Sequence, residues 1–374
     1  MEKVERAPGD FTLVLSIILL LGVGLSVLFS ASYYHAETTF GSPYFFLRRQ
    51  VLRVIIGGVL AYLASRLPTE SLRRYTPLLL FGSLVLMVLT FVPGIGTQVQ
   101  GSRRWLFAFG LSFEPSEAVK FAVVLYLANL FSKKKDKLND PLNTLLPPLI
   151  VVVVFVSLIY LQNDFSTSFF LLFVSFLMFY IAGIRLIYFL LLAGLAVPLG
   201  FLLLFTKEHR VRRLIAFIDP AIDPSGSGYQ IITARSALVD GGFLGKGLGK
   251  SVAKLGRLPE AHSDFIFAVV GEEIGLVGVV FVIVVFAVFA WRGYLISHRC
   301  EDSYRYYLAF GITTLVFFQS VLNMAVVAGI VPATGLPLPF FSSGGSSIVM
   351  TLFMCGILVR LSTEASGLRR PPHV

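Results

Sequence analysis

Ten runs of apolar residues, each long enough to cross a lipid bilayer, restrict the possible folds of this chain more than any other feature of its sequence. About 30 Å of hydrocarbon hold no water that can pair with backbone groups, so a spanning segment forms a helix of about 20 mostly apolar residues. We therefore expect an all-α polytopic membrane protein. Its expected spans lie near residues 11–32, 46–65, 76–93, 116–132, 144–162, 165–182, 186–206, 265–290, 306–331 and 343–361.

The composition agrees with this class. Of 374 residues, 56% are hydrophobic and 14% are charged, and the mean hydropathy is +0.82, whereas soluble domains carry about a quarter charged residues. Cys300 lies in a polar connection and Cys355 in an apolar run, which argues against a disulfide framework or a cysteine metal site. The net charge of +10 fits anionic lipid and membrane topology better than nucleic acid.

The distribution of Lys and Arg predicts the orientation, because cytoplasmic connections carry an excess of both. With the N-terminus inside, the inner tails and connections hold sixteen of these residues. The short outer connections hold four, namely Arg48, Arg49, Arg103 and Arg104. We expect both termini inside and a large outer segment at about 207–264. The first run follows Lys3 and Arg6 and is too long for a signal peptide, so it is expected to be a retained anchor.

The outer segment between the seventh and eighth spans is too long to be a simple connection. "KEHRVRRLIAFIDP" has a basic and an apolar face, which is typical of a helix lying in the membrane interface. "GGFLGKGLGKS" (241–251) predicts a glycine-rich turn region, and its "GLGKS" lacks the first glycine of a nucleotide-binding loop. We find no repeat and no separate soluble domain, and treat residues 1–374 as one membrane domain.

Ionisable residues inside the spans are the first candidate functional groups, because a charge at the bilayer centre costs several kcal/mol. Glu117 and Lys120 are three residues apart and can pair on one helix face. The pair is either a structural salt bridge or part of a polar cavity that positions catalytic groups. Arg53 is interpreted as reaching toward the interface, and Asp164 as an N-cap.

A carboxylate also stands where the eighth span begins, in "LPEAHSDFIFAVVGEE" (258–273). Asp264 there is either a helix N-cap or a general base whose proton affinity is raised by partial desolvation. Its neighbours favour the base, because one cap does not require the further carboxylates of Glu260, Glu272 and Glu273 beside His262.

Several motifs, in order along nearly the whole chain, resemble the SEDS family of shape, elongation, division and sporulation proteins. They are "RRWL…PSEAVK" (103–120), "GSGYQ" (226–230), "GGFLGKGLGKS" (241–251), "LPEAHSDFIFAVVGEEIGLVG" (258–278) and "NMAVVAGIVPATGLPLPFFSSGGSS" (323–347). "PEAH" and "PATGLPLP" are more similar to the division branch (FtsW) than to the rod-shape branch (RodA). The chain departs from the family at 162–167, where "QNDFST" replaces Gln-Pro-Asp-x-Gly-Thr, which weakens any catalytic or cation-binding role for Asp164.

The resemblance implies a peptidoglycan glycosyltransferase that polymerises lipid II at the outer membrane face, with Asp264 as the catalytic base. The implied supporting residues are Glu117, Lys120, Glu272, Glu273, His262, Arg53 and Asp164. The implied substrate-binding residues are Arg103, Arg104, Trp105, Arg210, Arg212, Arg213, Tyr229, Gln230, Lys246, Lys250, Lys254, Ser342 and Ser343. A divalent cation, Mg²⁺ or Mn²⁺, is a candidate cofactor for the pyrophosphate.

The resemblance further implies the cytoplasmic membrane of a bacterium and a class B penicillin-binding protein as transpeptidase partner, alongside other divisome or elongasome proteins. "SKKK" (132–135) lacks the companion motifs of a transpeptidase, so cross-linking has to come from that partner. Two other functions stay open: a lipid II flippase or transporter, and a non-catalytic division scaffold.

Overall fold

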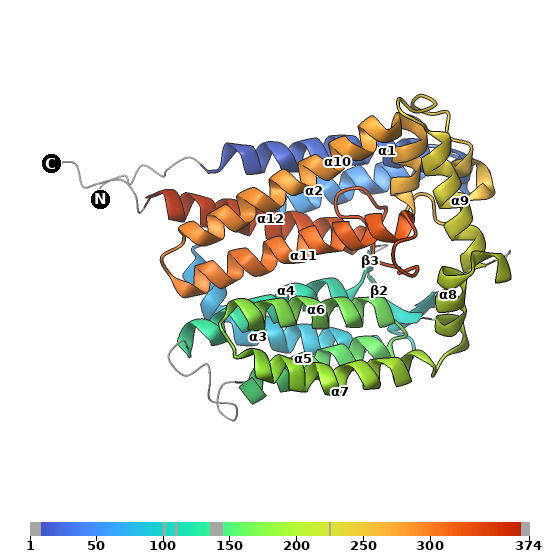
Figure 1. Ribbon diagram of the computed structural model, residues 1–374. Coiled ribbons are helices and arrows are strands. Elements are labelled where there is room, and N and C mark those ends of the chain that lie inside the picture. Colours follow the sequence, from blue (N-terminus) through green and yellow to red (C-terminus); the bar gives the residue numbers. More distant parts are fainter. Residues whose placement is uncertain (1–8, 100–101, 109–110, 135–144, 224–225, 368–374) are drawn as a thin grey trace.

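The computed structural model describes residues 9–99, 102–108, 111–134, 145–223 and 226–367. Within these ranges the chain forms twelve α-helices and one small sheet (Figure 1). The helices are α1 (Phe11–Phe40), α2 (Phe45–Arg66), α3 (Thr69–Leu89), α4 (Pro115–Lys133), α5 (Leu146–Leu161), α6 (Phe165–Ile181), α7 (Leu186–Leu204), α8 (Glu208–Ile218), α9 (Ser227–Asp240), α10 (Ile266–Arg299), α11 (Ser303–Val327) and α12 (Gly345–Gly367).

Each expected span coincides with one helix, and α8 and α9 fall in the expected outer segment. Five helices, α1, α3, α10, α11 and α12, are long and apolar enough to cross a membrane by length and composition. Some helices extend beyond the ends of the apolar runs, because the polar residues that flank a run can also be helical. α1 continues to Phe40 and stops at Gly41, which takes a left-handed conformation at φ 67°. Lys3 and Arg6 lie outside the described residues.

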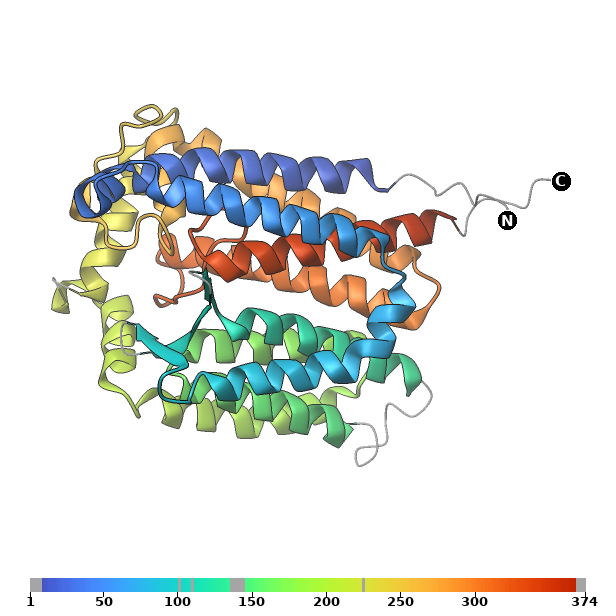
Figure 2. The same ribbon diagram turned by 180° about the vertical axis from the view of Figure 1, so that it is seen from behind.

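The long helices run side by side, and the start of α1 and the end of α12 lie at the same end of the bundle (Figures 1 and 2). α8, α9 and the sheet lie at the opposite end, which we call the sheet end. α4 packs against α3, α6 and α11 and so contacts helices from the early, middle and late parts of the chain. Most of its residues are buried accordingly.

The three-stranded antiparallel sheet between α3 and α4 was not expected from the sequence, so the fold is not purely α. Its order is β1 (Gly96–Val99), β2 (Ser102–Ala108), β3 (Leu111–Phe113), with Thr97 opposite Trp105. Successive side chains on a strand point to opposite faces. The sheet therefore turns Arg103 outward, where it is exposed, and Arg104 inward, where it is partly buried.

The glycine-rich segment 241–251 packs directly on α10. The backbone N–H groups of Lys246 and Gly247 donate to the carbonyls of Glu272 and Glu273 at 2.9 and 3.0 Å. Gly275 interrupts the helical geometry of α10 at φ 73°, and a Cβ there would collide with the backbone of Gly245. Only glycine permits this approach.

Candidate active site

Asp264 stands at the sheet end, just before α10, but it does not cap that helix. The N-cap position of α10 is Phe265, with no side-chain capping bond. The carboxylate of Asp264 instead accepts a hydrogen bond from the Ser263 hydroxyl at 3.2 Å. The alternative that Asp264 serves as a cap is therefore wrong, and the carboxylate is available for another role.

Helix α11 and its connection to α12 hold the backbone around Asp264 in place. The amide of Asn323 donates to the Asp264 carbonyl at 2.8 Å and to the Leu336 carbonyl at 2.9 Å. The Ser342 hydroxyl donates to the Ser263 carbonyl at 2.7 Å, and the Ser343 N–H donates to the His262 carbonyl at 3.1 Å. Ser342 and Ser343, expected to bind substrate, thus position the residues around Asp264.

Arg53 supports the same connection. Its guanidinium donates to the Ser343 carbonyl at 3.0 Å, and Gln50, one turn earlier on α2, donates to the Ser342 carbonyl at 3.0 Å. A Cβ on Gly345 would lie 2.6 Å from the guanidinium carbon, so the glycine makes room for it. The Arg53 guanidinium is therefore held by the connection between α11 and α12 and does not extend to the membrane interface.

Burial raises the pKa of the Asp264 carboxyl to about 6, and the nearby Glu260 raises it further. Arg104 and Arg213 act in the opposite direction, because their positive charges favour the carboxylate. The group can thus exchange a proton close to neutral pH, as a general base must.

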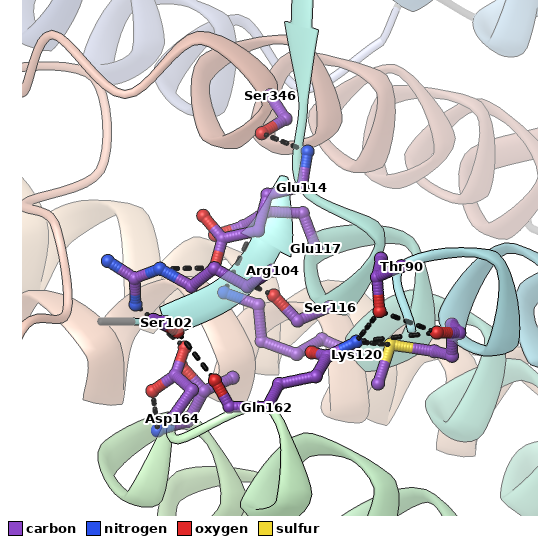
Figure 3. Close-up of polar contacts among 12 residues, drawn as sticks. Thr90, Ser102, Arg104, Glu114, Ser116, Glu117, Lys120, Gln162, Asp164 and Ser346 are labelled. Atoms are coloured by element: carbon purple, nitrogen blue, oxygen red, sulfur yellow. Dashed lines mark hydrogen bonds and ion pairs between the residues drawn. The ribbon is translucent and has the colours of Figure 1, made fainter. Parts of the chain in front are cut away.

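A second group of charges lies between β2, α4 and α6 (Figure 3). Arg104 donates to the Asp164 carboxylate at 2.9 Å, and its Nε lies 3.9 Å from Glu114. Asp164 also accepts from the Thr167 N–H at 3.1 Å and so caps α6, as expected. Burial acts to lower the pKa of Arg104, but these carboxylates raise it by more, so the guanidinium stays positively charged.

Glu117 and Lys120 form the expected ion pair, with 2.9 Å between Lys120 Nζ and Glu117 Oε2. Both are almost fully buried. Lys120 also donates to Gln319 at 2.7 Å, and Gln319 donates to the Pro337 carbonyl at 2.9 Å. Pro337 follows Leu336, whose carbonyl accepts from Asn323, and Asn323 also donates to the Asp264 carbonyl. The ion pair is therefore linked to the backbone of Asp264 through hydrogen bonds.

Glu114 belongs to this site although the sequence reasoning missed it. Burial raises the pKa of its carboxyl to about 7, Arg104 opposes that rise, and the carboxylates of Asp164 and Glu117 add to it. The Ser116 hydroxyl donates to it at 2.9 Å. Its signal in the sequence is a carboxylate directly before Pro115, which is easily mistaken for a polar helix start.

The three arginines of α8 point in different directions. Arg210 is buried, donates to the Leu203 carbonyl at 3.1 Å and lies 4.4 Å above the Tyr160 ring. Arg212 is exposed and pairs with Glu208 at 2.7 Å. Arg213 lies close enough to favour the charged form of Asp264, which makes it the candidate among the three to reach a substrate there.

Glu272 and Glu273 are not brought together with Asp264. Glu272 pairs with Lys246 at 2.8 Å, and Glu273 pairs with Lys254 at 2.8 Å and accepts from Ser30 at 2.6 Å. These bonds fasten the glycine-rich segment to α10 and tie Lys254, just beyond that segment, to α10 and α1. Lys246 and Lys254 are thereby engaged in ion pairs, and substrate binding by these two lysines stays a prediction.

The remaining expected residues lie around the sheet end. His262 stacks on His35 with 5.1 Å between ring centroids, and burial lowers the pKa of its imidazole. Trp105 packs beside Arg104. Tyr229 and Gln230 lie on α9 and Lys250 is exposed on the glycine-rich turn. Within the described residues, no group of three or more His, Cys, Asp and Glu side chains is placed to hold a metal ion.

Comparisons with known proteins identify the family of the chain. The family model of FtsW, RodA and SpoVE, described as cell cycle proteins, matches residues 11–367. A probable peptidoglycan glycosyltransferase FtsW from Trichlorobacter lovleyi is 38% identical, with 99% of this chain and 97% of the relative covered. One of the same description from Borreliella burgdorferi is 35% identical over 95% and 96% of the two chains.

Solved structures share the architecture. A chain of a peptidoglycan synthase complex, described as coordinating polymerization and crosslinking, superposes with a TM-score of 0.79 and 26% identity over 96% of this chain and 98% of its own length. The rod shape determining protein RodA of Thermus thermophilus gives a TM-score of 0.69 and 26% identity over 95% and 96%.

Proposed function

The chain belongs to the FtsW/RodA/SpoVE family of cell cycle proteins and is a peptidoglycan glycosyltransferase, and from that premise we propose that it polymerises lipid II with Asp264 as general base. The observation that carries the assignment is the Asp264 carboxyl itself. It caps no helix, its pKa is raised to about 6, and two arginines act on its charge.

The proposed reaction is a single displacement. The 4-hydroxyl oxygen of the acceptor sugar attacks the anomeric carbon of the donor, Asp264 takes the hydroxyl proton, and the bond to the undecaprenyl pyrophosphate breaks with its electron pair leaving on that group. One displacement inverts the donor carbon, which converts an α-linked lipid into a β-1,4 glycan strand. Arg104 and Arg213 would stabilise the negative charge on the leaving pyrophosphate.

A divalent cation would have to be held mainly by the pyrophosphate, because the described residues do not form a metal site of their own. A chelator in the polymerisation assay tests this proposal. We expect it to lower the rate without lowering the thermal midpoint of the protein, whereas a resident metal would stabilise the fold as well.

We further propose that all the helices of the described residues except α8 and α9 span the bacterial cytoplasmic membrane, with the sheet end outside and both termini inside. The exposed basic residues at the opposite end of the bundle, such as Arg66, Arg74 and Lys133, support this orientation. A class B penicillin-binding protein would cross-link the strands, a proposal supported by the likeness to a chain of a complex that couples polymerization and crosslinking.

The buried Glu117–Lys120 pair is the observation that favours a second candidate, a lipid II transporter, because intramembrane ion pairs also line translocation paths. A transporter would move lipid II across liposomes without chain growth. The polymerase interpretation places the chemistry at the sheet end, where Asp264 lies.

The deciding experiment compares wild type with Asp264→Asn in a lipid II polymerisation assay with the transpeptidase partner present. Asparagine keeps the size but accepts no proton at neutral pH, and loss of a general base lowers rates by about a hundredfold to ten-thousandfold. Asp219→Asn is the matched control, because exposed Asp219 only accepts from Ala221 N–H and the amide oxygen can replace it. Normal glycan from purified Asp264→Asn protein would rule out the assignment.

A further inference from the structure

A groove of about 530 Å³ lies between α3, α4 and α5. It reaches the last turn of α4, which lies at the end of the bundle opposite the sheet end (Figures 1 and 2). Its middle is lined by apolar side chains, and it is open to the outside of the bundle, where Phe81 and Ile150 are more than half exposed. The apolar lining includes Leu80, Leu84, Leu130, Val151 and Val154. Such a volume is typical of a small-molecule site.

A second hollow of about 300 Å³ continues the groove toward the end of the bundle, since both share Pro77, Asn129 and Lys133. Among the described residues, its lining adds Arg73, Arg74 and one acid, Glu70. Glu70 lies 4.0 Å from Arg305, so its charge is already partly compensated. The hollow is therefore positively charged, and it joins the apolar groove without a gap.

Arg73 is held in the hollow by neighbouring elements. Its Nε donates to Asn129 and its Nη2 to Ser132, both at 3.4 Å, and its guanidinium lies 5.3 Å from the centre of the Tyr304 ring. An arginine fixed in this way is prepared for a planar phosphate contact. Basic residues that only mark a membrane boundary do not require such an arrangement.

We propose that the groove and the hollow together bind one anionic phospholipid of the leaflet at this end of the bundle. An acyl chain would lie in the groove between α3 and α5, and the phosphate would contact Arg73, Arg74 and Lys133. Basic pockets between transmembrane helices select anionic head groups in this manner. The site is separate from the proposed lipid II site, because Asp264 lies at the sheet end.

The charge of the hollow is tested with phosphatidylglycerol. Protein in detergent is titrated with phosphatidylglycerol or phosphatidylcholine, and bound lipid is counted by native mass spectrometry. The double variant Arg74→Gln/Lys133→Gln should bind phosphatidylglycerol roughly thirtyfold more weakly, since each cation contributes about a factor of five. The matched control, Arg66→Gln/Arg299→Gln, removes the same charge at the same end of the bundle but outside the hollow, and should bind as wild type does.

The groove is tested by filling it. Val154→Trp places a large side chain in the groove, whereas Val153→Trp, one residue earlier and 48% exposed, lies outside its lining. The first variant should lose the bound phospholipid and the second should keep it. Equal retention by the two variants, or equal affinity of wild type for phosphatidylcholine, would overturn the proposal.

A measurement on unaltered protein guards against misfolded variants. Wild type is placed in vesicles of phosphatidylcholine with a minor fraction of phosphatidylglycerol that carries a photoreactive acyl chain, and cross-linked peptides are identified. Adducts should concentrate on residues 77–84 and 150–155. Adducts spread evenly over all lipid-facing helices would contradict a specific site.

Discussion

The carboxyls of Asp264 and Glu114 titrate in adjacent pH ranges, and Arg104 acts on both. A base must be deprotonated to act, so kcat/KM should rise with pH through about 6 as Asp264 ionises. Glu114 ionises near 7 and then offsets more of the Arg104 charge that would face the pyrophosphate. We therefore expect a partial decline of kcat/KM above pH 7.

Glu114→Gln should abolish that decline and leave the limb near pH 6 in place, because glutamine can still accept from Ser116 but carries no charge. The measurement is a pH profile of lipid II polymerisation by purified protein. Glu208→Gln, which removes an exposed carboxylate paired with Arg212, is the control and should leave the profile unchanged. If wild type and Glu114→Gln give the same profile, Glu114 plays no part in the reaction.

The sequence was sufficient to predict the roles of some single residues and insufficient for others. Asp264 could be selected because a carboxylate at the edge of an apolar run is costly, and Glu117 with Lys120 because of their spacing. Lys246 and Lys254 could not be judged, since their partners Glu272 and Glu273 come from a different segment. Pairing between distant segments is a tertiary property that no local pattern contains.

At the scale of elements, β2 separates two adjacent arginines by strand alternation. Arg104→Gln should lower kcat/KM about tenfold or more, because it removes the charge proposed to stabilise the leaving pyrophosphate, and a hydrogen bond to a charged group is worth about 1.5–3 kcal/mol. Arg103→Gln, on the opposite face and exposed, should change it less than threefold. The measurement is kcat/KM for lipid II polymerisation by both variants. Equal losses of kcat/KM would show that the two arginines do not differ in function although they lie on opposite faces of β2.

Helix α4 carries a second prediction of this scale. Glu117→Ala and Lys120→Ala each leave a buried charge unpaired, which costs about 3–5 kcal/mol when one partner of a buried pair is removed. Each should lower the thermal midpoint in detergent and reduce polymerisation strongly. The charge-swapped double variant should recover stability more than activity if the pair also orients Gln319 and the connection beyond it. Wild-type polymerisation by Glu117→Ala would contradict any role for the pair.

Helices and strands differed in how well the sequence predicted them. Every apolar run became a helix, because a long run of apolar residues carries a strong signal of its own. The strands were missed because "SRRWLFA" is too short for its alternation to stand out and its partners pair through the tertiary fold. The sheet is nevertheless what turns Arg104 inward, so this omission also hid Glu114.

For the whole molecule, the placement of the site at one end of the bundle requires that this end face the cell wall. The uneven distribution of Lys and Arg in the sequence predicted that orientation, and the structure adds that α8, α9 and the start of α10, two residues after Asp264, share the sheet end. Neither observation includes a membrane, so the orientation is tested by labelling. Cys300→Ser gives a suitable background, because Cys355 is buried.

In that background, Ser227→Cys on α9 should react with a membrane-impermeant maleimide in intact spheroplasts, because α9 lies in the segment that we propose is outside. Lys133→Cys, exposed at the last turn of α4, should react only after permeabilisation. The reverse pattern would place Asp264 in the cytoplasm, where the proposed strand could not join the wall, and would remove the basis of the polymerase mechanism. Labelling of both cysteines in intact cells would indicate leaky membranes, which a cytoplasmic marker protein detects, so the comparison is made only where that marker stays unlabelled.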